Sequence, residues 1–445
     1  MSVPKHQSYK DSGVSWLGLI PSHWATRRTR RLCEIKKRIV GELGFDVLSI
    51  TQTGIRVKDT ESNDGQVSMD YSKYQLVEPG DFAMNHMDLL TGFVDISPVR
   101  GVTSPDYRVF SLREENVADP KYMLYLFQNG YINRVFYAFG QGSSQFGRWR
   151  MPSDQFNELT LPLPPLEEQV SIAAFLDREI AKIDTLVDEQ ERLVALLKEK
   201  RRTVISKAVT KGLDPNVPVK DSGVAWLGNV PAHWAISSLK RIVETPITDG
   251  PHETPNFPDE GVPFVSAEAV SSGLLNFEKK RGYISHEDHQ RYSLKYLPRR
   301  GDIFMIKSGA TTGVTAIVET DLEFNIWSPL AVVRCNEYCD PYFVLNFMRS
   351  KNFLEAVTLN WSFGTQQNIG MGVVENLSVP VPPRAEQKQI VAFLSTVVGK
   401  LDSLTAEADG AIPLLKERRS ALISAAVTGK IDVRGLVPQP EAVAA

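Results

Sequence analysis

Two long stretches of the chain place apolar residues along one face of a helix. After Pro165, apolar side chains recur at steps of seven in two series that interleave by three and four, which is typical of a coiled-coil seam. A second stretch after Pro383 has the same pattern. We therefore predict two long helices, the first about 70 Å long over residues 166–211, that pack as an antiparallel coiled coil. The residues expected at the seam are Leu176, Ile183, Leu197, Val204, Leu394, Leu401, Leu415 and Leu422.

Three residues depart from a uniformly apolar pair of helices. Arg201 and Arg419 occupy equivalent positions in the two seams. A polar seam residue can fix the register of the helices, or its guanidinium can extend out of the seam into water, and the pattern leaves both open. Pro413 lacks an N–H and has Gly410 nearby, so we expect it to kink or interrupt the second helix.

Both helical stretches belong to a duplication of the chain. Residues 162–214 align without a gap to residues 380–432 with 24 of 53 positions identical, and residues 10–25 return at 220–235 with 12 of 16 identical. A repeat this long that occurs only twice is typical of a duplicated domain and not of a solenoid. The expected organisation is a box at 1–25, a variable domain at 26–160, a central spacer helix at 161–214, a second box at 215–235, a variable domain at 236–378, a C-terminal spacer helix at 379–432 and a flexible tail at 433–445.

The variable domains combine strand and helix patterns. Short apolar runs bounded by turn residues predict strands, and Asp-Pro pairs predict the starts of two helices. The expected fold class is therefore α/β (α+β), with two mixed α/β domains in tandem, joined and followed by the long helices. The strand runs lie at 46–50, 81–84, 263–266 and 302–306, and the helices at 120–129 and 341–350.

The composition is that of a globular chain without a strong charge bias. Apolar residues make up 42% and charged residues 23%, and the formal net charge is −3. This excludes a uniformly basic protein, but it allows a nucleic-acid binder whose positive charge lies on one face. There is no apolar signal-peptide core, no stretch apolar enough to span a bilayer, and three cysteines cannot make a disulfide framework. We therefore expect a cytoplasmic protein with no membrane association.

Motifs of several enzyme classes are missing from the sequence. It contains no P-loop, no dinucleotide-binding glycine pattern after a strand, and no Asn/Asp-Pro-Pro-Tyr/Phe motif of amino-methyltransferases. A weak alternative is a Mg²⁺-dependent nuclease, in which Asp259 and Glu278 hold the ion and Lys280 stabilises developing charge. That pattern is short and has no counterpart in the first half, so a solvated loop is the preferred interpretation.

Cysteines and histidines form no strong metal-binding motif. One short cysteine pair has two histidines upstream, but no second pair exists, so buried or incidental thiols are the preferred interpretation. His23 and His233 recur in the Trp-Leu-Gly…Pro-x-His-Trp box among aromatic and small residues, which favours packing over catalysis. No residue is predicted to be catalytic or to bind a metal. The residues of the weak zinc pattern are Cys335, Cys339, His286 and His289.

Two polar loops lie at corresponding places in the repeat. Residues 142–150 are flexible, aromatic and basic, and residues 363–368 are their counterpart. Arginine can pair with guanine, and glutamine or asparagine with adenine, in the major groove of DNA. A single loop of this kind is more often a solvated surface, but two at matching positions favour DNA recognition. The residues predicted to contact DNA are Asn85, His86, Gln145, Arg148, Arg150, Lys307, Gln366, Gln367 and Asn368.

Two variable domains, each preceded by the box and followed by a Pro-x-Pro-Pro…Glu-Gln…Phe-Leu helix, resemble the specificity subunit of type I restriction–modification enzymes. The resemblance covers nearly the whole chain and is strongest in the repeated segments. It implies that each variable domain is a target recognition domain that reads one half of a bipartite site on double-stranded DNA. It also implies that the helices fix the gap, in a circular, pseudo-twofold arrangement with the N-terminal box near the end of the second helix.

The same resemblance implies a non-catalytic subunit with several protein partners. Two modification (methyltransferase) subunits would dock on the helices, and restriction (translocase) subunits would complete the complex. S-adenosylmethionine would bind the modification subunits, and ATP with Mg²⁺ the restriction subunit, so no cofactor is expected on this chain. The alternatives are the nuclease built on Asp259, Glu278 and Lys280, and a purely structural coiled-coil scaffold.

Overall fold

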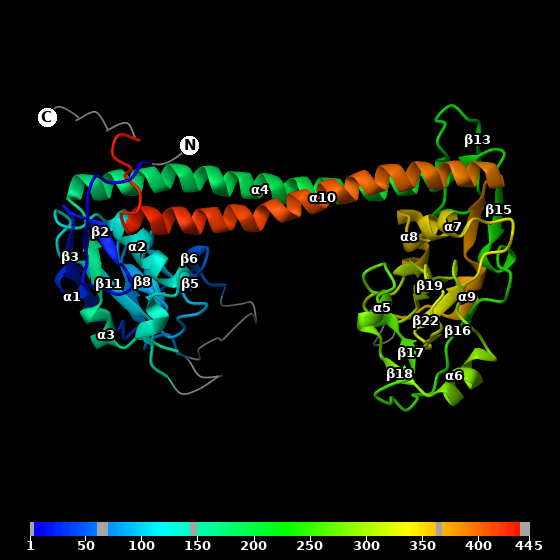
Figure 1. Ribbon diagram of the computed structural model, residues 1–445, viewed down its shortest axis with the longest axis horizontal. Helices are drawn as coiled ribbons and strands as arrows, with labels where there is room; N and C mark the ends of the chain where they lie inside the picture. Colours follow the sequence, from blue (N-terminus) through cyan, green and yellow to red (C-terminus); the bar gives the residue numbers. More distant parts are fainter. Residues whose placement is uncertain (1–3, 60–69, 143–148, 362–366, 437–445) are drawn as a thin grey trace. The chain divides into compact units, whose positions relative to one another are not determined.

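The structure is a computed structural model that describes residues 4–59, 70–142, 149–361 and 367–436 (Figure 1). The chain divides into two compact units. Unit 1 consists of Met1–Gln190 with Gly410–Ala445, and unit 2 consists of Glu191–Asp409. The two longest helices, α4 and α10, each contribute residues to both units. None of the helices in the described part of the chain is long and apolar enough to cross a membrane.

Unit 1 is built around an antiparallel sheet of four strands in the order β4-β11-β8-β9. The box forms a hairpin of β1 and β2, and β3 pairs with β12 just before α4 begins. The strands are β1 (Tyr9–Asp11), β2 (Leu19–Pro21), β3 (Ala25–Arg28), β4 (Cys33–Lys36), β5 (Leu48–Thr51), β6 (Gly54–Val57), β7 (Gln75–Val77), β8 (Phe82–Met84), β9 (Val94–Ile96), β10 (Gly101–Thr103), β11 (Arg108–Leu112) and β12 (Thr160–Leu163). The helices are α1 (Thr29–Leu32), α2 (Pro120–Ile132), the 3₁₀ helix η1 (Phe136–Phe139), α3 (Ser153–Glu158) and the start of α4 (Leu166–Lys211).

The core of unit 1 lies where α2 packs on this sheet. Asp119 caps α2 by accepting a hydrogen bond from the N–H of Tyr122, and Pro120 occupies a first-turn position where a missing N–H costs nothing. Phe110 of the sheet meets Phe127 of α2 edge to face at 5.2 Å between ring centroids, and Phe82 stacks on Phe110 within the sheet at 5.0 Å. Such rings bury large apolar areas, so α2 and the sheet hold each other in place.

Unit 2 repeats this plan with the sheet order β16-β22-β19-β20. It adds a three-stranded sheet, β18-β17-β21, in which β17 and β21 run parallel. The strands are β13 (Val219–Asp221), β14 (Asn229–Pro231), β15 (Ala235–Ser238), β16 (Thr248–Asp249), β17 (Val262–Val265), β18 (Gly282–Ile284), β19 (Ile303–Ile306), β20 (Thr315–Ile317), β21 (Asn325–Ile326), β22 (Leu330–Val333) and β23 (Ser378–Val381). The helices are η2 (Leu239–Arg241), α5 (Ala267–Val270), η3 (Phe277–Lys279), α6 (His286–Ser293), α7 (Pro341–Met348), α8 (Lys351–Leu359), α9 (Met371–Asn376) and α10 (Arg384–Val427).

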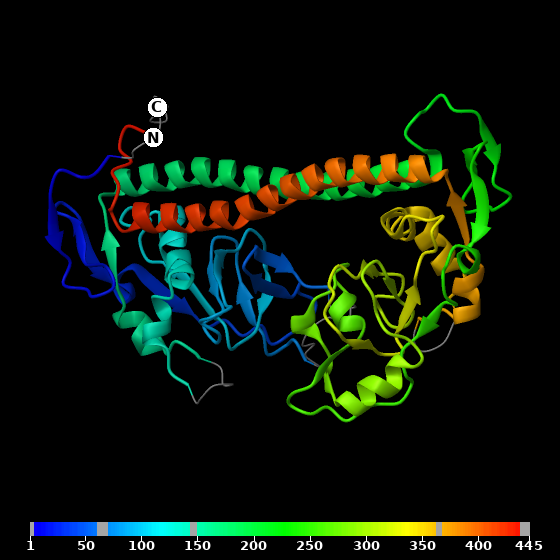
Figure 2. The same ribbon diagram turned by 45° about the vertical axis from the view of Figure 1, so that its right-hand side comes forward.

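Helices α4 and α10 lie side by side (Figures 1 and 2). In unit 2, Arg201 contacts Asp402 at 2.7 Å and Lys198 lies 4.0 Å from Asp409, so residue numbers fall along one helix as they rise along the other. The helices are therefore antiparallel, as the sequence predicts. The mixed α/β domains and the paired long helices confirm the expected fold class.

Most of the predicted seam residues are shielded from solvent. Leu176, Ile183, Leu197, Leu394 and Leu401 are buried, whereas Val204, Leu415 and Leu422 are partly buried. The apolar face of each helix thus packs against the other helix and the domain beneath it.

The seam arginines reach out of the interface and bind the opposite helix. Arg201 pairs with Asp402 in unit 2, and Arg419 pairs with Asp184 at 3.1 Å in unit 1. Both guanidiniums are about one-third exposed. The two alternatives left open by the sequence therefore occur together, because each arginine extends toward water and still ties its helix to a fixed position on the partner.

Pro413 does not interrupt α10, so the expected interruption was wrong, while the expected kink stays a prediction. The helix is continuous from Arg384 to Val427 with the proline inside it. Pro413 lies on the exposed side of α10, where the ring displaces no packed side chain. Proline removes one hydrogen bond, and the helix continues on both sides of it.

The N-terminal segment closes onto the end of α10 within unit 1. The N–H of Asp432 donates to the carbonyl of Pro4 at 2.8 Å. Gly429, with a positive φ of 71°, lies so close to Pro21 and Trp24 that an added Cβ would approach Pro21 to 2.3 Å. This contact confirms that the box lies near the end of the second helix.

Replacing Leu197 by aspartate should destabilise the helix pair, because it places a charge in the buried seam. We expect Leu197→Asp to lose about 3–5 kcal/mol of unfolding free energy, the range for an uncompensated buried charge. Leu196 is the matched control, since it is 52% exposed while its neighbour Leu197 is 8% exposed. Leu196→Asp should change stability little in the same denaturant titration. Equal losses in the two variants would contradict the seam assignment.

Replacing Pro413 by alanine should stabilise the protein. Alanine restores the missing helical hydrogen bond, and a proline inside a helix costs about 3 kcal/mol. We expect Pro413→Ala to raise the melting temperature, measured by the loss of helical circular dichroism. An unchanged or lower melting temperature would mean that the proline relieves some other strain in α10.

Candidate DNA-recognition surfaces and their anchors

The predicted DNA-contacting residues of unit 1 gather beside the end of β8. Asn85 and His86 follow this strand directly, and the N–H of Met151 donates to the carbonyl of His86 at 3.0 Å. Gln141 and Arg150 pair as an isolated antiparallel bridge, so they form the two sides of the loop base. The structure therefore brings Asn85, His86 and Arg150 together. Two other predicted residues, Gln145 and Arg148, lie outside the described residues.

Unit 2 has the same arrangement at the end of β19. The N–H of Ile369 donates to the carbonyl of Lys307 at 2.9 Å, which matches the bond from Met151 to His86 in unit 1. Ser308 and Asn368 form an isolated bridge, and the N–H of Gly309 donates to the carbonyl of Gln367 at 2.9 Å. Lys307, Gln367 and Asn368 therefore lie together, and Gln366 lies outside the described residues. The amide side chains of Gln367 and Asn368 belong to exposed residues.

A hollow of about 850 Å³ adjoins the loop base in unit 1. Its lining mixes polar, aromatic and aliphatic residues, and it includes Asn85 and Trp149. The Trp149 indole donates to the carbonyl of Tyr137 at 2.9 Å, and the two rings pack with centroids 5.3 Å apart. The hollow is lined in part by Tyr71, Tyr74, Asn85, Asp88, Tyr107 and Trp149.

A buried arginine holds the base of the unit 1 loop. Arg108 is 3% exposed, donates to the carbonyl of Met151 at 2.9 Å, and lies 4.5 Å from the centre of the Phe156 ring. Burial lowers the pKa of Arg108 to about 10, which leaves it charged at neutral pH. Burial, with a smaller contribution from Arg108, lowers the pKa of His86 to about 3. His86 is therefore a neutral imidazole at neutral pH.

Lys307 is engaged in an ion pair inside unit 2. Its ammonium lies 2.6 Å from Asp249, and Lys295 lies 2.8 Å from the other oxygen of the same carboxylate. Burial by itself would raise the pKa of Asp249, but hydrogen bonds from Lys295 and Lys307 lower it below its usual value. The Lys307 side chain is only 13% exposed. Its main chain shapes the loop base, while its ammonium is already paired with Asp249 within the domain.

A Glu-Gln pair at the start of each long helix anchors the recognition domain, a role that the sequence analysis did not predict. The Gln169 amide donates to the carbonyls of Val117 and Pro164 and accepts from the N–H of Asp119. Gln387 makes the matching three bonds in unit 2, to Tyr338, Pro382 and Asp340. The sequence did contain a signal for this role, because Glu-Gln recurs at the start of both long helices. A polar pair at a buried helix start needs hydrogen-bond partners.

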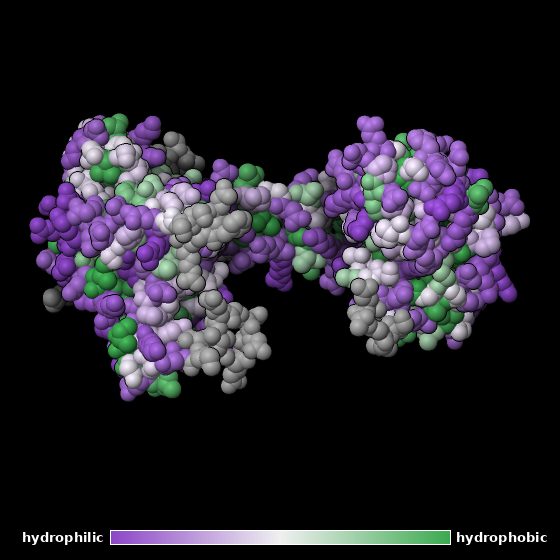
Figure 3. Space-filling model, turned by 90° about the horizontal axis from the view of Figure 1, so that it is seen from below, coloured by the Kyte–Doolittle hydropathy of each residue, from purple (hydrophilic) through white to green (hydrophobic). Residues whose placement is uncertain are grey.

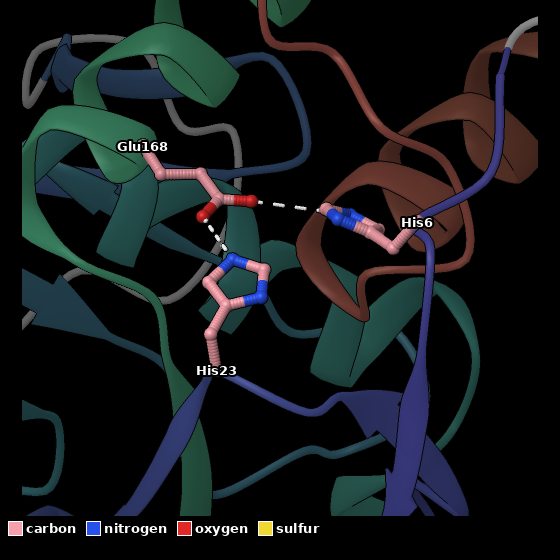
Figure 4. Close-up of side chains that lie close together, drawn as sticks. All are labelled: His6, His23 and Glu168. Carbon is pink, nitrogen blue, oxygen red and sulfur yellow. Dashed lines mark hydrogen bonds and ion pairs between the residues drawn. The ribbon is translucent and has the colours of Figure 1, made fainter.

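The box histidines bind the glutamates of these pairs. His23 Nε2 lies 2.7 Å from Glu168, and His233 Nε2 lies 2.7 Å from Glu386. The Trp24 indole also donates to Glu168 at 3.0 Å. In unit 1 a further histidine, His6, lies beside the same carboxylate (Figure 4). Burial lowers the pKa of His6, against the opposing influence of Asp432 and Glu168.

The weak sequence signals for catalysis and zinc do not coincide with the group of possible metal ligands in the described residues. Within the described ranges, the one group of His, Cys, Asp and Glu side chains close enough to share a metal ion is His6, His23 and Glu168. It includes neither carboxylate of the nuclease pattern nor any residue of the Cys335–Cys339 pattern. Both thiols are largely shielded, and burial raises the pKa of Cys339 to about 11.

The fold defines a protein with two similar recognition domains on paired antiparallel helices. A family model for the type I restriction modification DNA specificity domain matches the chain twice, over residues 21–194 and 231–409. The chain therefore belongs to this family, and it is a specificity subunit of a type I restriction–modification system with two specificity domains in tandem. The nuclease alternative receives no support from these matches.

Curated relatives and solved structures agree with this assignment. The chain is 22% identical to a putative type I restriction enzyme MjaX specificity subunit of Methanocaldococcus jannaschii, over 97% of this chain and 98% of the relative. It is 24% identical to the EcoBI specificity subunit of Escherichia coli, over 65% of this chain and 62% of that one. A chain from a structure that describes the assembly and conformational transition of a type I R-M system has the same fold. The match covers 94% of this chain and 99% of that chain, with a TM-score of 0.69 and 18% sequence identity. The match to the crystal structure of the HsdS subunit of Thermoanaerobacter tengcongensis covers 93% of this chain and 98% of that chain, with a TM-score of 0.55 and 18% sequence identity.

The depressed pKa of His86 predicts an acid-sensitive stability. The folded-state pKa of about 3 lies below the ordinary value of 6.5, so the unfolded chain binds a proton more readily between these values. The contribution of neutral His86 to the free energy of unfolding is fully present above about pH 6.5, and it is lost as the pH decreases toward 3. We expect His86→Gln to reduce the loss of unfolding free energy between pH 7 and pH 4.5, measured by urea titration. Parallel losses in the variant and the wild type would show that His86 is not the titrating group.

Proposed function

We propose that each unit reads one half of a split sequence on double-stranded DNA, with the loop base beside β8 or β19 as the reading surface. The support is that a loop sequence rich in donors and acceptors meets the end of the same strand in both units. In each unit, one main-chain hydrogen bond holds the end of the loop against the residues that follow the strand. The donor and acceptor are Met151 and His86 in unit 1, and Ile369 and Lys307 in unit 2. Such a surface holds its side chains in a defined position, which base recognition requires.

The two halves of the target should differ. Unit 1 offers Arg150 and Asn85, whereas unit 2 offers the amides of Gln367 and Asn368. Arginine pairs best with guanine, and amide side chains pair best with adenine. The hydrophilic faces of both units in Figure 3, where hydrophobic residues occur as scattered spots, are suited to a polar, wet DNA interface.

The paired helices would act as the spacer that fixes the gap between the half-sites. The helices have 46 and 44 residues, and within each unit an ion pair joins them. Coupling two modest readers in one chain raises the overall affinity through effective concentration. Exposed apolar residues remain on the outer faces of the helices, and we propose that two methyltransferase subunits dock there, with restriction subunits completing the assembly. They include Val170, Leu186, Leu193, Leu196, Phe393 and Leu404.

The cofactors of such a system would lie on the partner subunits. S-adenosylmethionine would serve the methyltransferases, and ATP with Mg²⁺ the restriction subunits. This chain would supply target choice and geometry, and it would do so in the cytoplasm, where its three cysteines remain free thiols. A purely structural scaffold is less consistent with the chain, because a scaffold has no need of two reader surfaces with matched geometry.

Reader substitutions should affect one half-site each. In the complex with methyltransferase subunits, Arg150→Ala should weaken recognition by about 1–3 kcal/mol for one base pair of the first half-site. Asn368→Ala should do the same for the second half-site only. Each variant is the matched control for the other, and both should still assemble with the partners. The measurement is methylation of a target library in which each base pair is varied in turn.

An Arg150→Ala variant that leaves every base preference unchanged would exclude this loop from reading. Loss of preference in both half-sites at once would point to a general loss of phosphate binding, which a shallower dependence of affinity on salt concentration would reveal.

A further inference from the structure

His6, His23 and Glu168 meet at one point in unit 1, although they come from separate places in the chain (Figure 4). His6 precedes β1, His23 follows β2, and Glu168 lies in the first turn of α4. One ligand atom from each lies within 4.8 Å of the others. The proposed reading of DNA uses none of these side chains.

The separations are short enough for one ion to reach all three side chains. His23 Nε2 lies 2.7 Å from Glu168 Oε2, and His6 Nε2 lies 3.9 Å from Glu168 Oε1. Zinc with bonds of about 2.0–2.1 Å places its donors about 3.3 Å apart. The first distance is about 0.6 Å shorter than this value and the second about 0.6 Å longer, and they involve different oxygens of Glu168, so the side chains would rotate to bind a single ion.

The state of the His6 ring is a second, independent observation that favours a metal ion at this site. His6 is 6% exposed, and its Nδ1 has no hydrogen-bond partner among the described residues. Its Nε2 lies 3.2 Å from the carbonyl of Ile431, so in the metal-free chain Nε2–H donates there and Nδ1 is left bare. That bare nitrogen faces the Asp432 carboxylate at 3.7 Å, an unfavourable contact between a lone pair and an anion.

Metal binding would remove this conflict. If Nε2 binds the ion in place of its bond to Ile431, the ring proton moves to Nδ1 and points at Asp432. A carboxylate behind a ligating histidine is the usual support for such a ligand. Arg434 holds the Asp432 carboxylate at 2.6 Å and keeps it in position.

We propose that His6, His23 and Glu168 bind one transition-metal dication of the zinc type, with water completing the coordination. The two imidazoles and one carboxylate are the donors that such an ion prefers. The His23 side chain is 39% exposed, which gives the ion a path from solvent. The bound ion fastens the N-terminal segment to the start of α4, beside the end of α10.

Unit 2 supplies a control within the same molecule. His233 and Glu386 repeat the histidine–glutamate pair at the same 2.7 Å. The position that corresponds to His6 at the repeat offset is Asn216. The second copy therefore has two of the three donors, and we expect it to bind no ion at concentrations that fill the first.

The test is titration of the full-length, chelator-treated chain with Zn²⁺ by calorimetry, and with Co²⁺ by visible absorption. The wild type should bind one equivalent, and Co²⁺ should give a tetrahedral spectrum without thiolate charge transfer. His6→Gln should weaken binding by more than about tenfold, because losing a ligand costs at least as much as losing a supporting carboxylate. His233→Gln should bind as the wild type does.

A second variant guards against misfolding of the first. Asp432→Asn keeps all three ligands and should weaken binding by about 10–100-fold, while circular dichroism confirms the native helix content of each variant. No binding by the wild type, or equal binding by His6→Gln, would overturn the proposal. A thiolate charge-transfer band would also overturn it, because the ion would then lie on Cys335 and Cys339.

Discussion

The apolar faces of α4 and α10 are buried against each other, and the rest of the structure depends on that pairing. A helix of 46 residues with an apolar face cannot remain stable alone in water, because its stripe would stay exposed. The antiparallel contact buries the stripe and places the start of one helix beside the end of the other in each unit. Each recognition domain then packs on both helices at once, so its orientation is fixed by two elements.

The Glu-Gln pairs connect this helix frame to the readers. Gln169 and Gln387 each satisfy one N–H and one carbonyl of the loop before α2 or α7, and one carbonyl of the segment that enters the long helix. Buried main-chain groups without partners are costly, so these amides hold the loop that begins α2 or α7. The same helices pack on the central sheets, whose strands β8 and β19 end at the reading loops. A continuous set of buried contacts therefore runs from the helix seam to the surface that would meet DNA.

The sequence predicted the elements with strong periodicity or exact recurrence, and it missed those that depend on distant pairing. Heptad spacing was sufficient for the helix pair, and the matching loops led to Arg150 and Asn368. Strand order escaped prediction because partners such as β4 and β11 are far apart in sequence and share no pattern. The continuity of α10 through Pro413 also escaped prediction, because the residue pattern alone does not show it. His6 has no counterpart in the second copy, so no repeat marked it before folding placed it beside Glu168.

The two ion pairs of the seam join equivalent positions of the two copies of the repeat. Arg201 and Arg419 are equivalent positions of the repeat, and so are Asp184 and Asp402. Each arginine therefore binds the aspartate of the opposite copy, so the two contacts are one contact made in both directions. Reciprocity of this kind is the mark of an isologous interface between identical subunits. A half-length ancestor could have satisfied both contacts as a homodimer, and duplication and fusion of its gene would have freed each reader to diverge while the shared seam kept both copies compatible.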